Sequence, residues 1–166
     1  LGISEKSNNR TRLLLKVLAV SDIVIYRTRA ERLKSDLFTF LGKASKAYIQ
    51  HFSNELRAAS HRGNFSCPLS EMGPVVVIFH ETLHTDPLRE EGDLKPEDYL
   101  RQRFQELSQS IEAFSALEYV GTHTSNPPTN FNELRSCLLK HLNNSTVRSA
   151  RHPSVIYNAL KVNLII

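Results

Sequence analysis

The chain has 166 residues, of which 40% are hydrophobic and 23% are charged, and its 21 Lys and Arg against 17 Asp and Glu give a net charge of +4. This length fits one domain, the apolar share excludes wholesale disorder, and two Cys exclude a disulfide scaffold and favour a reducing compartment. No apolar run reaches the roughly 18 residues that a membrane-spanning helix needs. The basic residues follow predicted helix faces, and no aromatic nucleic-acid motif accompanies them, so no nucleic-acid partner is expected.

The first half of the chain predicts helix, strand and helix. Residues 10–20 carry apolar side chains at helical spacing, and residues 23–26 form a short β-branched run that is typical of a buried strand. Residues 29–58 repeat apolar side chains every three or four positions, which predicts one long helix.

The second half continues the alternation after a Gly- and Pro-marked loop over residues 60–73. The run 75–79 predicts a second buried strand, Pro96 begins a helix with an apolar stripe that reaches residue 111, and 117–120 is a third strand. Asn130 and Glu133 are spaced as a capping pair for the next helix, and a last helix is expected over residues 153–161.

This order predicts an α/β fold with a parallel sheet and helices on both faces. Three strands make a thin sheet, and the pattern begins on a helix. Leu1 also replaces the expected initiator Met. We therefore expect further strands before Leu1, so that the chain is part of a larger domain.

Polar segments follow each predicted strand. They are residues 27–29, 80–82 and 121–124. Ligands of open α/β sheets bind outside the carboxyl ends of the strands, so these segments are candidates for one shared site. Ordinary loop solvation would give the same composition, and both interpretations remain open at this point.

Residues His80 to His84 spell H-E-x-x-H, the motif with which zinc peptidases place two imidazoles and a general base on one helix. The preceding run 75–79 favours a strand instead, and Pro87 leaves little room for a helix. A zinc peptidase therefore remains as an alternative, and a polar loop at the end of a strand is preferred.

The sequence contains neither a phosphate-binding loop nor a motif for a catalytic Ser or Cys. Gly42-Lys43 lacks the upstream Gly and the following Ser or Thr of a phosphate-binding loop, and it lies within a predicted helix. There is no G-x-S-x-G, and neither Cys67 nor Cys137 has a catalytic signature beside it. The sequence thus predicts no catalytic residue.

Four strings carry a specific resemblance, namely residues 10–28, 77–82, 126–129 and 151–153. They closely resemble the double-FYVE family of zinc-finger proteins. The resemblance implies that residues 1–161 are the C-terminal half of a P-loop nucleoside-triphosphatase domain, distantly similar to the large GTPases, with 162–166 as a divergent apolar tail. The phosphate loop and the magnesium-facing acid would then lie before Leu1.

The same resemblance implies base-binding roles for four residues. His80 and Glu81 fall where large GTPases place a base-recognition element, and Thr122 and His123 follow the third strand, where they can pack on the base. Their pattern differs from that of the large GTPases, which leaves ATP or GTP open. Magnesium would serve the complete domain, this chain would hold no metal, and zinc would bind only in FYVE fingers outside it.

The resemblance also implies the biology of the longer protein. It would act in autophagosome formation on the cytoplasmic face of endoplasmic reticulum, omegasome, Golgi and lipid-droplet membranes, with FYVE fingers that bind phosphatidylinositol 3-phosphate. It can form a homodimer. This chain alone is expected not to hydrolyse nucleotide. A non-catalytic interaction scaffold is the remaining alternative beside the zinc peptidase.

Overall fold

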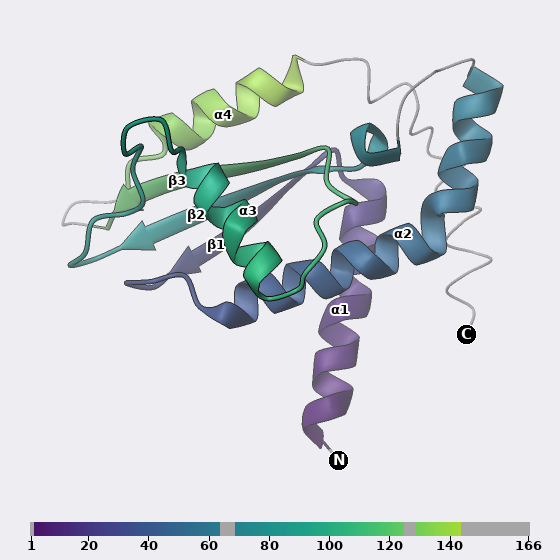
Figure 1. Ribbon diagram of the computed structural model, residues 1–166, viewed down its shortest axis with the longest axis horizontal. Helices are drawn as coiled ribbons and strands as arrows, with labels where there is room; N and C mark the ends of the chain where they lie inside the picture. The colour runs from purple at the N-terminus through teal and green to yellow at the C-terminus, as the bar shows by residue number, and fades with distance from the viewer. Residues whose placement is uncertain (1, 64–68, 125–128, 144–166) are drawn as a thin grey trace.

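The computed structural model describes residues 2–63, 69–124 and 129–143 (Figure 1). Helices alternate with strands along the described chain. The elements are α1 (Gly2–Val20), β1 (Ile23–Arg29), α2 (Ser35–Gly63), the 3-10 helix η1 (Leu69–Met72), β2 (Val75–Thr82), α3 (Pro96–Glu106), β3 (Ala116–His123) and α4 (Asn132–Leu142).

Within the described residues the strands form one parallel sheet in the order β1-β2-β3. Thr28 lies opposite His80, and His80 lies opposite Gly121, so the three carboxyl ends meet at one end of the sheet. The expected α/β fold with a parallel sheet is confirmed. In this described sheet β1 and β3 are the edge strands.

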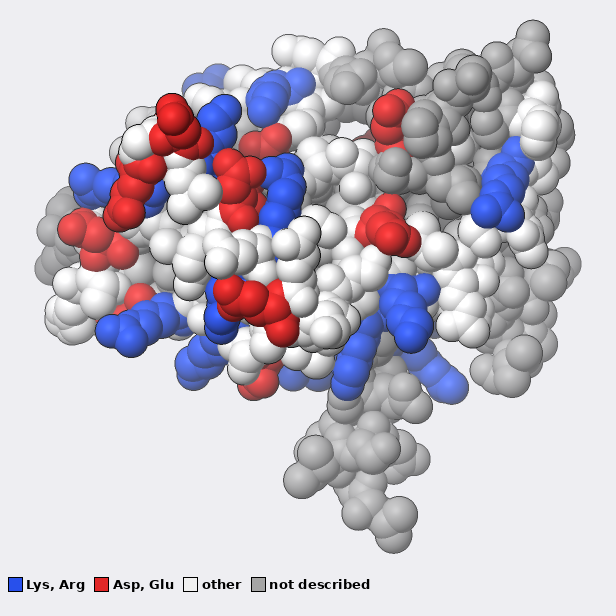
Figure 2. Space-filling view, viewed as in Figure 1, with Lys and Arg blue, Asp and Glu red and all other residues white. Residues whose placement is uncertain are grey.

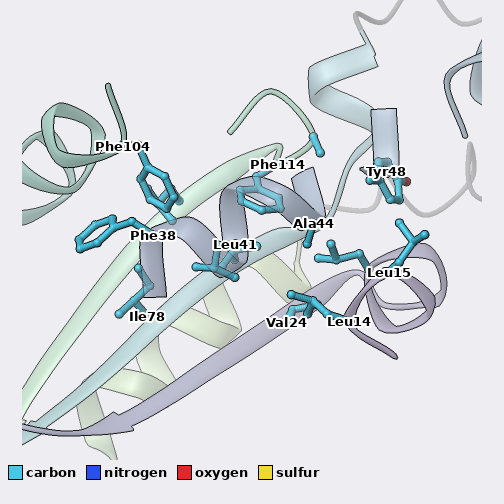
Figure 3. Packing of buried hydrophobic residues seen from close by; sticks show 14 of the residues in the cluster. Leu14, Leu15, Val24, Phe38, Leu41, Ala44, Tyr48, Ile78, Phe104 and Phe114 are labelled. Atoms are coloured by element: carbon cyan, nitrogen blue, oxygen red, sulfur yellow. The ribbon is translucent and has the colours of Figure 1, made fainter. Parts of the chain in front are cut away.

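The larger core lies between one face of the sheet and helices α1, α2 and α3 (Figure 3). The apolar stripe of α2 supplies Phe38, Leu41 and Tyr48, which are nearly or fully buried, and α3 adds Leu100 and Phe104. Each such side chain contributes about 1.5–3 kcal/mol through burial. Both crossover helices therefore cover the same face.

Helix α4 packs on the opposite face of the sheet, over a smaller cluster built on Val77, Phe79 and Val120. It contributes Leu134, Cys137 and Leu138, which are only partly buried, and it has no fully buried residue. The helices thus cover both faces, as expected, but α4 is held by little apolar contact.

The strands are longer than the sequence pattern indicates. Strand β1 runs to Arg29 rather than ending at residue 26, and β2 continues through Thr82. Polar residues continue the strand pairing because their backbone N–H and C=O groups form hydrogen bonds with the neighbouring strands. Consequently, residues 27–29 and 80–82 are strand residues rather than loops.

Two helix boundaries also differ from the expectation. Helix α2 begins at Ser35 rather than near residue 29, and α3 ends at Glu106 although its apolar stripe continues to Ile111. The expected capping pair is wrong: Phe131 is the N-cap of α4, and Asn130 accepts a hydrogen bond from the N–H of Asn132 in a turn just before the helix. The helix expected over residues 153–161 lies outside the described residues.

Charged side chains of both signs intermingle on the surface in Figure 2. Such mixing gives no broad field of one sign on the visible face. Among the described helices, none combines the length and apolarity required for a transmembrane span.

Candidate functional site

The polar ends of the strands divide between the two faces of the sheet. Successive side chains of a strand point to opposite faces, so Glu81 lies on the α4 face beside its register neighbours Arg29 and Thr122. His80 and His123 lie on the face covered by α2 and α3. The four residues expected at a nucleotide base therefore do not converge on one point.

Glu81 is the centre of a hydrogen-bonded cluster on the α4 face, which we call the Glu81 cluster: Glu81, Arg27, Arg29 and Thr129. Arg27 donates Nε to Oε2 at 2.6 Å and Nη2 to Oε1 at 3.0 Å, and the Thr129 hydroxyl donates to Oε1 at 2.7 Å. Arg29 Nε donates to Oε2 at 3.3 Å. The Glu81 side chain is fully buried, so its carboxylate is satisfied within the protein.

The cluster keeps Glu81 ionised. Hydrogen bonds from Arg27 above all, and then from Thr129 and Arg29, lower its pKa to about 2 against the opposing effect of burial. Arg27 is in turn placed over the rings of Phe79 and Phe131, at 6.0 and 5.8 Å from their centroids. The arrangement links the end of β2 to β1 and to the segment before α4.

His80 is the centre of a second network, on the opposite face. Its Nε2 lies 2.7 Å from the carbonyl oxygen of Ala30, which can only accept, so this nitrogen carries the proton. Nδ1 then accepts from the Tyr119 hydroxyl at 2.8 Å, and that hydroxyl accepts from the N–H of Leu88 at 3.0 Å. The neutral imidazole thus links β2 to the residue that follows β1 and to β3, and the Tyr119 hydroxyl extends this link to the segment of Leu88.

Burial lowers the pKa of His80 below its ordinary value, because the charged imidazolium would lose its surrounding water, and the hydrogen bond to the Ala30 carbonyl oxygen and the charge of Glu31 only partly oppose this effect. Below the ordinary value of about 6.5 the unfolded chain takes up a proton that the folded chain resists. Stability should therefore fall as the pH falls through this range, and the loss should level off below the folded pKa.

Urea unfolding at pH 7.5 and pH 5.5 measures this effect. We expect His80→Gln to lose much of the pH dependence of the wild-type protein. The control variant His84→Gln, which alters an exposed residue, should keep it. Equal pH dependence in the wild type and His80→Gln would contradict the assignment of a buried neutral imidazole.

The H-E-x-x-H residues do not form the helix that a zinc peptidase requires. His80 and Glu81 are in β2 and point to opposite faces, and His84 is exposed. The loop after β2 instead wraps the Glu31 carboxylate, which accepts from the backbone N–H groups of Leu83, His84 and Thr85. These bonds, led by that of His84, lower the Glu31 pKa to about 2.

A cavity of about 610 Å³ lies beside the carboxyl end of β3 and is large enough for a nucleobase and its ribose. Thr122 and His123 both line it, together with the first turns of α3 and α4 and the segment after β2. The remaining lining residues are Pro87, Leu88, Arg89, Glu90, Pro96, Glu97, Tyr119, Gly121 and Glu133.

The cavity walls are fixed by polar contacts. Glu97 accepts the N–H of Tyr119 on β3 at 3.0 Å, and the His123 ring lies between Asp86 and Thr82, 3.0 and 3.4 Å away. At Gly121 a Cβ would come within 2.5 Å of the Pro87 side chain, so only glycine fits there. The positions of Tyr119 and His123 are thus set before any ligand binds.

One buried polar atom near this end of the sheet lacks a partner in the part of the chain that the structure describes. The Thr124 hydroxyl is buried and makes no hydrogen bond with any residue that the structure describes. Its backbone N–H is bonded to the Thr82 carbonyl oxygen at 2.6 Å, which keeps the residue in place. A buried hydroxyl of this kind is a potential contact for a bound molecule or an ordered water.

Comparison with known proteins gives one set of relatives. The chain is 53% identical to the mouse and human proteins named Zinc finger FYVE domain-containing protein 1, over 162 residues or 97% of its length. The orangutan protein of the same name is 52% identical over the same span. The chain spans about a fifth of the length of these relatives, 21% for the mouse and human proteins.

Two further comparisons found no match. No protein-family model matches the chain. No solved structure matches it either. The similarity to the FYVE-containing proteins therefore rests on sequence identity alone.

Sequence patterns missed several partners of the site. Thr129 reaches Glu81 across 48 positions of sequence, and Glu97 reaches Tyr119 across 22. No local pattern indicates such contacts. Arg27 and Arg29 did carry a usable signal, because they continue the period-two alternation of β1 on the same face as Ile25.

Proposed function

We propose that this chain supplies the base-binding side of a nucleoside-triphosphate site in a longer FYVE zinc-finger protein. The observation that supports this most is the cavity beside β3, at the carboxyl end of a parallel sheet, with Thr122 and His123 in its wall. Nucleotides bind at this end of open α/β sheets. The similarity to FYVE-containing proteins over 97% of the chain supports the longer context.

In this proposal Thr122 and His123 contact the nucleotide base directly. The His123 ring offers a flat surface for a base, and the Thr122 hydroxyl offers a hydrogen bond. Glu133, at the first turn of α4, lies in the same wall and can accept from the N–H groups on a base edge. Its carboxylate would take the base-binding role that the resemblance implied for Glu81.

His80 and Glu81 then support the site. Glu81 could accept from a base only by losing a bond within the Glu81 cluster, and both ring nitrogens of His80 are in use. Their contacts fix the ends of β1 and β2 and the segment before α4. We therefore propose that they position the site without touching the nucleotide.

The phosphates and magnesium would be bound by residues outside this chain. Helix α1 packs in the same core as α2, and crossover connections between parallel strands are right-handed, so a strand before α1 would lie against the free edge of β1. Phosphoryl transfer depends on electrostatic stabilisation from groups around the phosphates. We expect no ATP or GTP hydrolysis by the 166-residue chain.

We further propose that the longer protein acts at membranes. In this view its FYVE fingers bind phosphatidylinositol 3-phosphate, and it serves autophagosome formation at the endoplasmic reticulum, with Golgi and lipid droplets as further sites. The nucleotide domain would regulate that membrane activity, with a homodimer as its assembled form.

Fluorescent ATP and GTP analogues test the proposal on the longer protein that contains this chain. We expect saturable binding with magnesium. His123→Ala and Thr122→Val should each weaken binding by about tenfold, the equivalent of one lost hydrogen bond or stacking contact of about 1.4 kcal/mol. The exposed-loop variant His84→Ala should bind as the wild type does.

No saturable nucleotide binding by the longer protein would contradict the proposal and favour a non-catalytic scaffold. Equal binding by the wild type, His123→Ala and Thr122→Val would also contradict it, because the cavity would then not contain the base. Robust hydrolysis by the 166-residue chain alone would contradict the proposal that the phosphates and magnesium are bound by residues outside this chain.

A further inference from the structure

Three potential metal ligands lie together between β3 and α4, and none of them lines the cavity. They are Glu118 on β3 and Cys137 and His141 on α4, which we call the β3–α4 triad. A carboxylate oxygen, the thiol sulfur and an imidazole nitrogen all lie within 4.8 Å of one another. The two helix residues are four positions apart, so both project from the same face of α4.

We propose that the β3–α4 triad binds a divalent transition metal ion of the zinc class. Thiolate, imidazole and carboxylate are the three side-chain groups that zinc takes as ligands, and borderline-soft sulfur disfavours magnesium and calcium. Around a tetrahedral zinc ion the ligand atoms are about 3.5 Å apart. The triad is near that spacing, so small side-chain rotations would complete it.

The present contacts show where the ion would bind. His141 Nε2 lies 2.8 Å from Glu118 Oε1, and Lys140 Nζ lies 3.1 Å from the same oxygen. A positive group thus already binds this carboxylate from the side of α4. A metal ion would replace both hydrogen bonds, and the Cys137 thiol would release its proton to solvent as it became a ligand.

The surroundings suit such an ion. Cys137 packs against the apolar cluster of Val77, Phe79 and Val120, so one side of the triad is shielded from water. The side chains of Glu118 and His141 are only 19% and 12% exposed. Three protein ligands leave a fourth coordination position for water or for another group.

The packing of α4 gives the ion a structural role. No residue of α4 is fully buried, and its apolar contact with the sheet is limited to partly buried side chains. Two ligands on α4 and one on β3 would tie this helix to the sheet. Because the first turn of α4 also lines the cavity, metal binding would stabilise that wall. The metal proposal does not depend on nucleotide binding.

Titration of the metal-free 166-residue protein with cobalt(II) and zinc(II) tests the proposal. We expect one equivalent of cobalt to bind with a thiolate-to-cobalt charge-transfer band in the near ultraviolet. Zinc should displace cobalt and raise the Tm, because it binds the folded chain in preference to the unfolded chain. Glu118→Gln and His141→Gln should weaken zinc binding at least about tenfold in competition with a chromogenic chelator.

Matched controls separate this site from other sulfur and imidazole groups. Cys137→Ser should abolish the charge-transfer band, whereas Cys67→Ser should retain it. His84→Gln should bind zinc as the wild type does, which also separates the triad from the H-E-x-x-H residues. A helical circular dichroism spectrum like that of the wild type would show that each variant is folded.

Absence of stoichiometric zinc binding by the folded wild-type protein would overturn the proposal. A charge-transfer band that survives Cys137→Ser, or zinc binding that is lost in His84→Gln but kept in His141→Gln, would also overturn it. The expected result would place a zinc ion in this chain, in contrast to the sequence-based expectation that zinc binds only in FYVE fingers outside it.

Discussion

Replacement of Glu81 by alanine is expected to lower the free energy of unfolding at pH 7 by about 3 kcal/mol. The Glu81 side chain is fully buried, and its carboxylate accepts from Arg27, Arg29 and Thr129. Removal of the carboxylate leaves a void and a buried hydroxyl without its acceptor. The two arginines are partly exposed and regain water, which limits the cost.

The dependence on pH identifies the cause. The folded pKa of Glu81 is about 2, below the ordinary value, so its ionised form stabilises the fold above about pH 4.5. This contribution is lost as the pH falls towards 2. The difference between wild type and Glu81→Ala in chemical unfolding should therefore shrink in acid.

Glu106→Ala is the matched control, because it removes a partly exposed carboxylate that pairs with Arg103 on the surface of α3. Such exposed pairs contribute up to about 1 kcal/mol, and we expect a loss below that. If Glu81→Ala cost no more than Glu106→Ala, the Glu81 cluster would not anchor the strand ends.

Replacement of Gly73 by alanine should also destabilise the chain by about 3 kcal/mol, through a clash with backbone. Gly73 precedes β2, and a Cβ there would lie 1.7 Å from the carbonyl oxygen of Ala113. The segment before β3 cannot easily move aside, because the Ser115 N–H is bonded to the Pro74 carbonyl oxygen at 3.1 Å. Thermal and urea unfolding would measure the loss.

Gly92→Ala provides the control for this substitution. Gly92 has φ +62°, and a Cβ there would meet no atom within 4 Å, so only backbone strain of about 1 kcal/mol is expected. If Gly73→Ala lowered the stability no more than Gly92→Ala, that result would contradict the close approach of the segments before β2 and β3. The comparison separates a steric effect from a conformational one.

The order of elements could be predicted because it depends on local pattern. The β-branched runs 23–26 and 75–79 and the stripe of α2 each mark their element, and Pro96 marks the first turn of α3. Strand ends could not be predicted in the same way. Arg27 and Glu81 belong to strands because the backbone pairs Arg27 with Phe79 and Arg29 with Glu81, and the side chains of Arg27 and Glu81 also bond to each other. These contacts are distant in sequence.

The candidate site was only partly predictable for the same reason. The rule for open α/β sheets pointed to the end of the sheet where the three strands end, and its segment 121–124 includes Thr122 and His123, which line the cavity. It could not show that Glu81 is satisfied by Thr129 or that His80 is bonded to Ala30. Nor could a pattern search within one segment join Glu118 to the Cys137 and His141 of α4.

Photolabelling with nucleotides that carry an azido group on the base is the most direct test of the proposed base-binding role. The longer protein would be labelled with adenine and guanine analogues, digested and analysed by mass spectrometry. We predict label at the end of β3, on Thr122, His123 or their immediate neighbours, with protection by excess unmodified nucleotide. Protectable labelling confined to residues outside this chain would contradict the account.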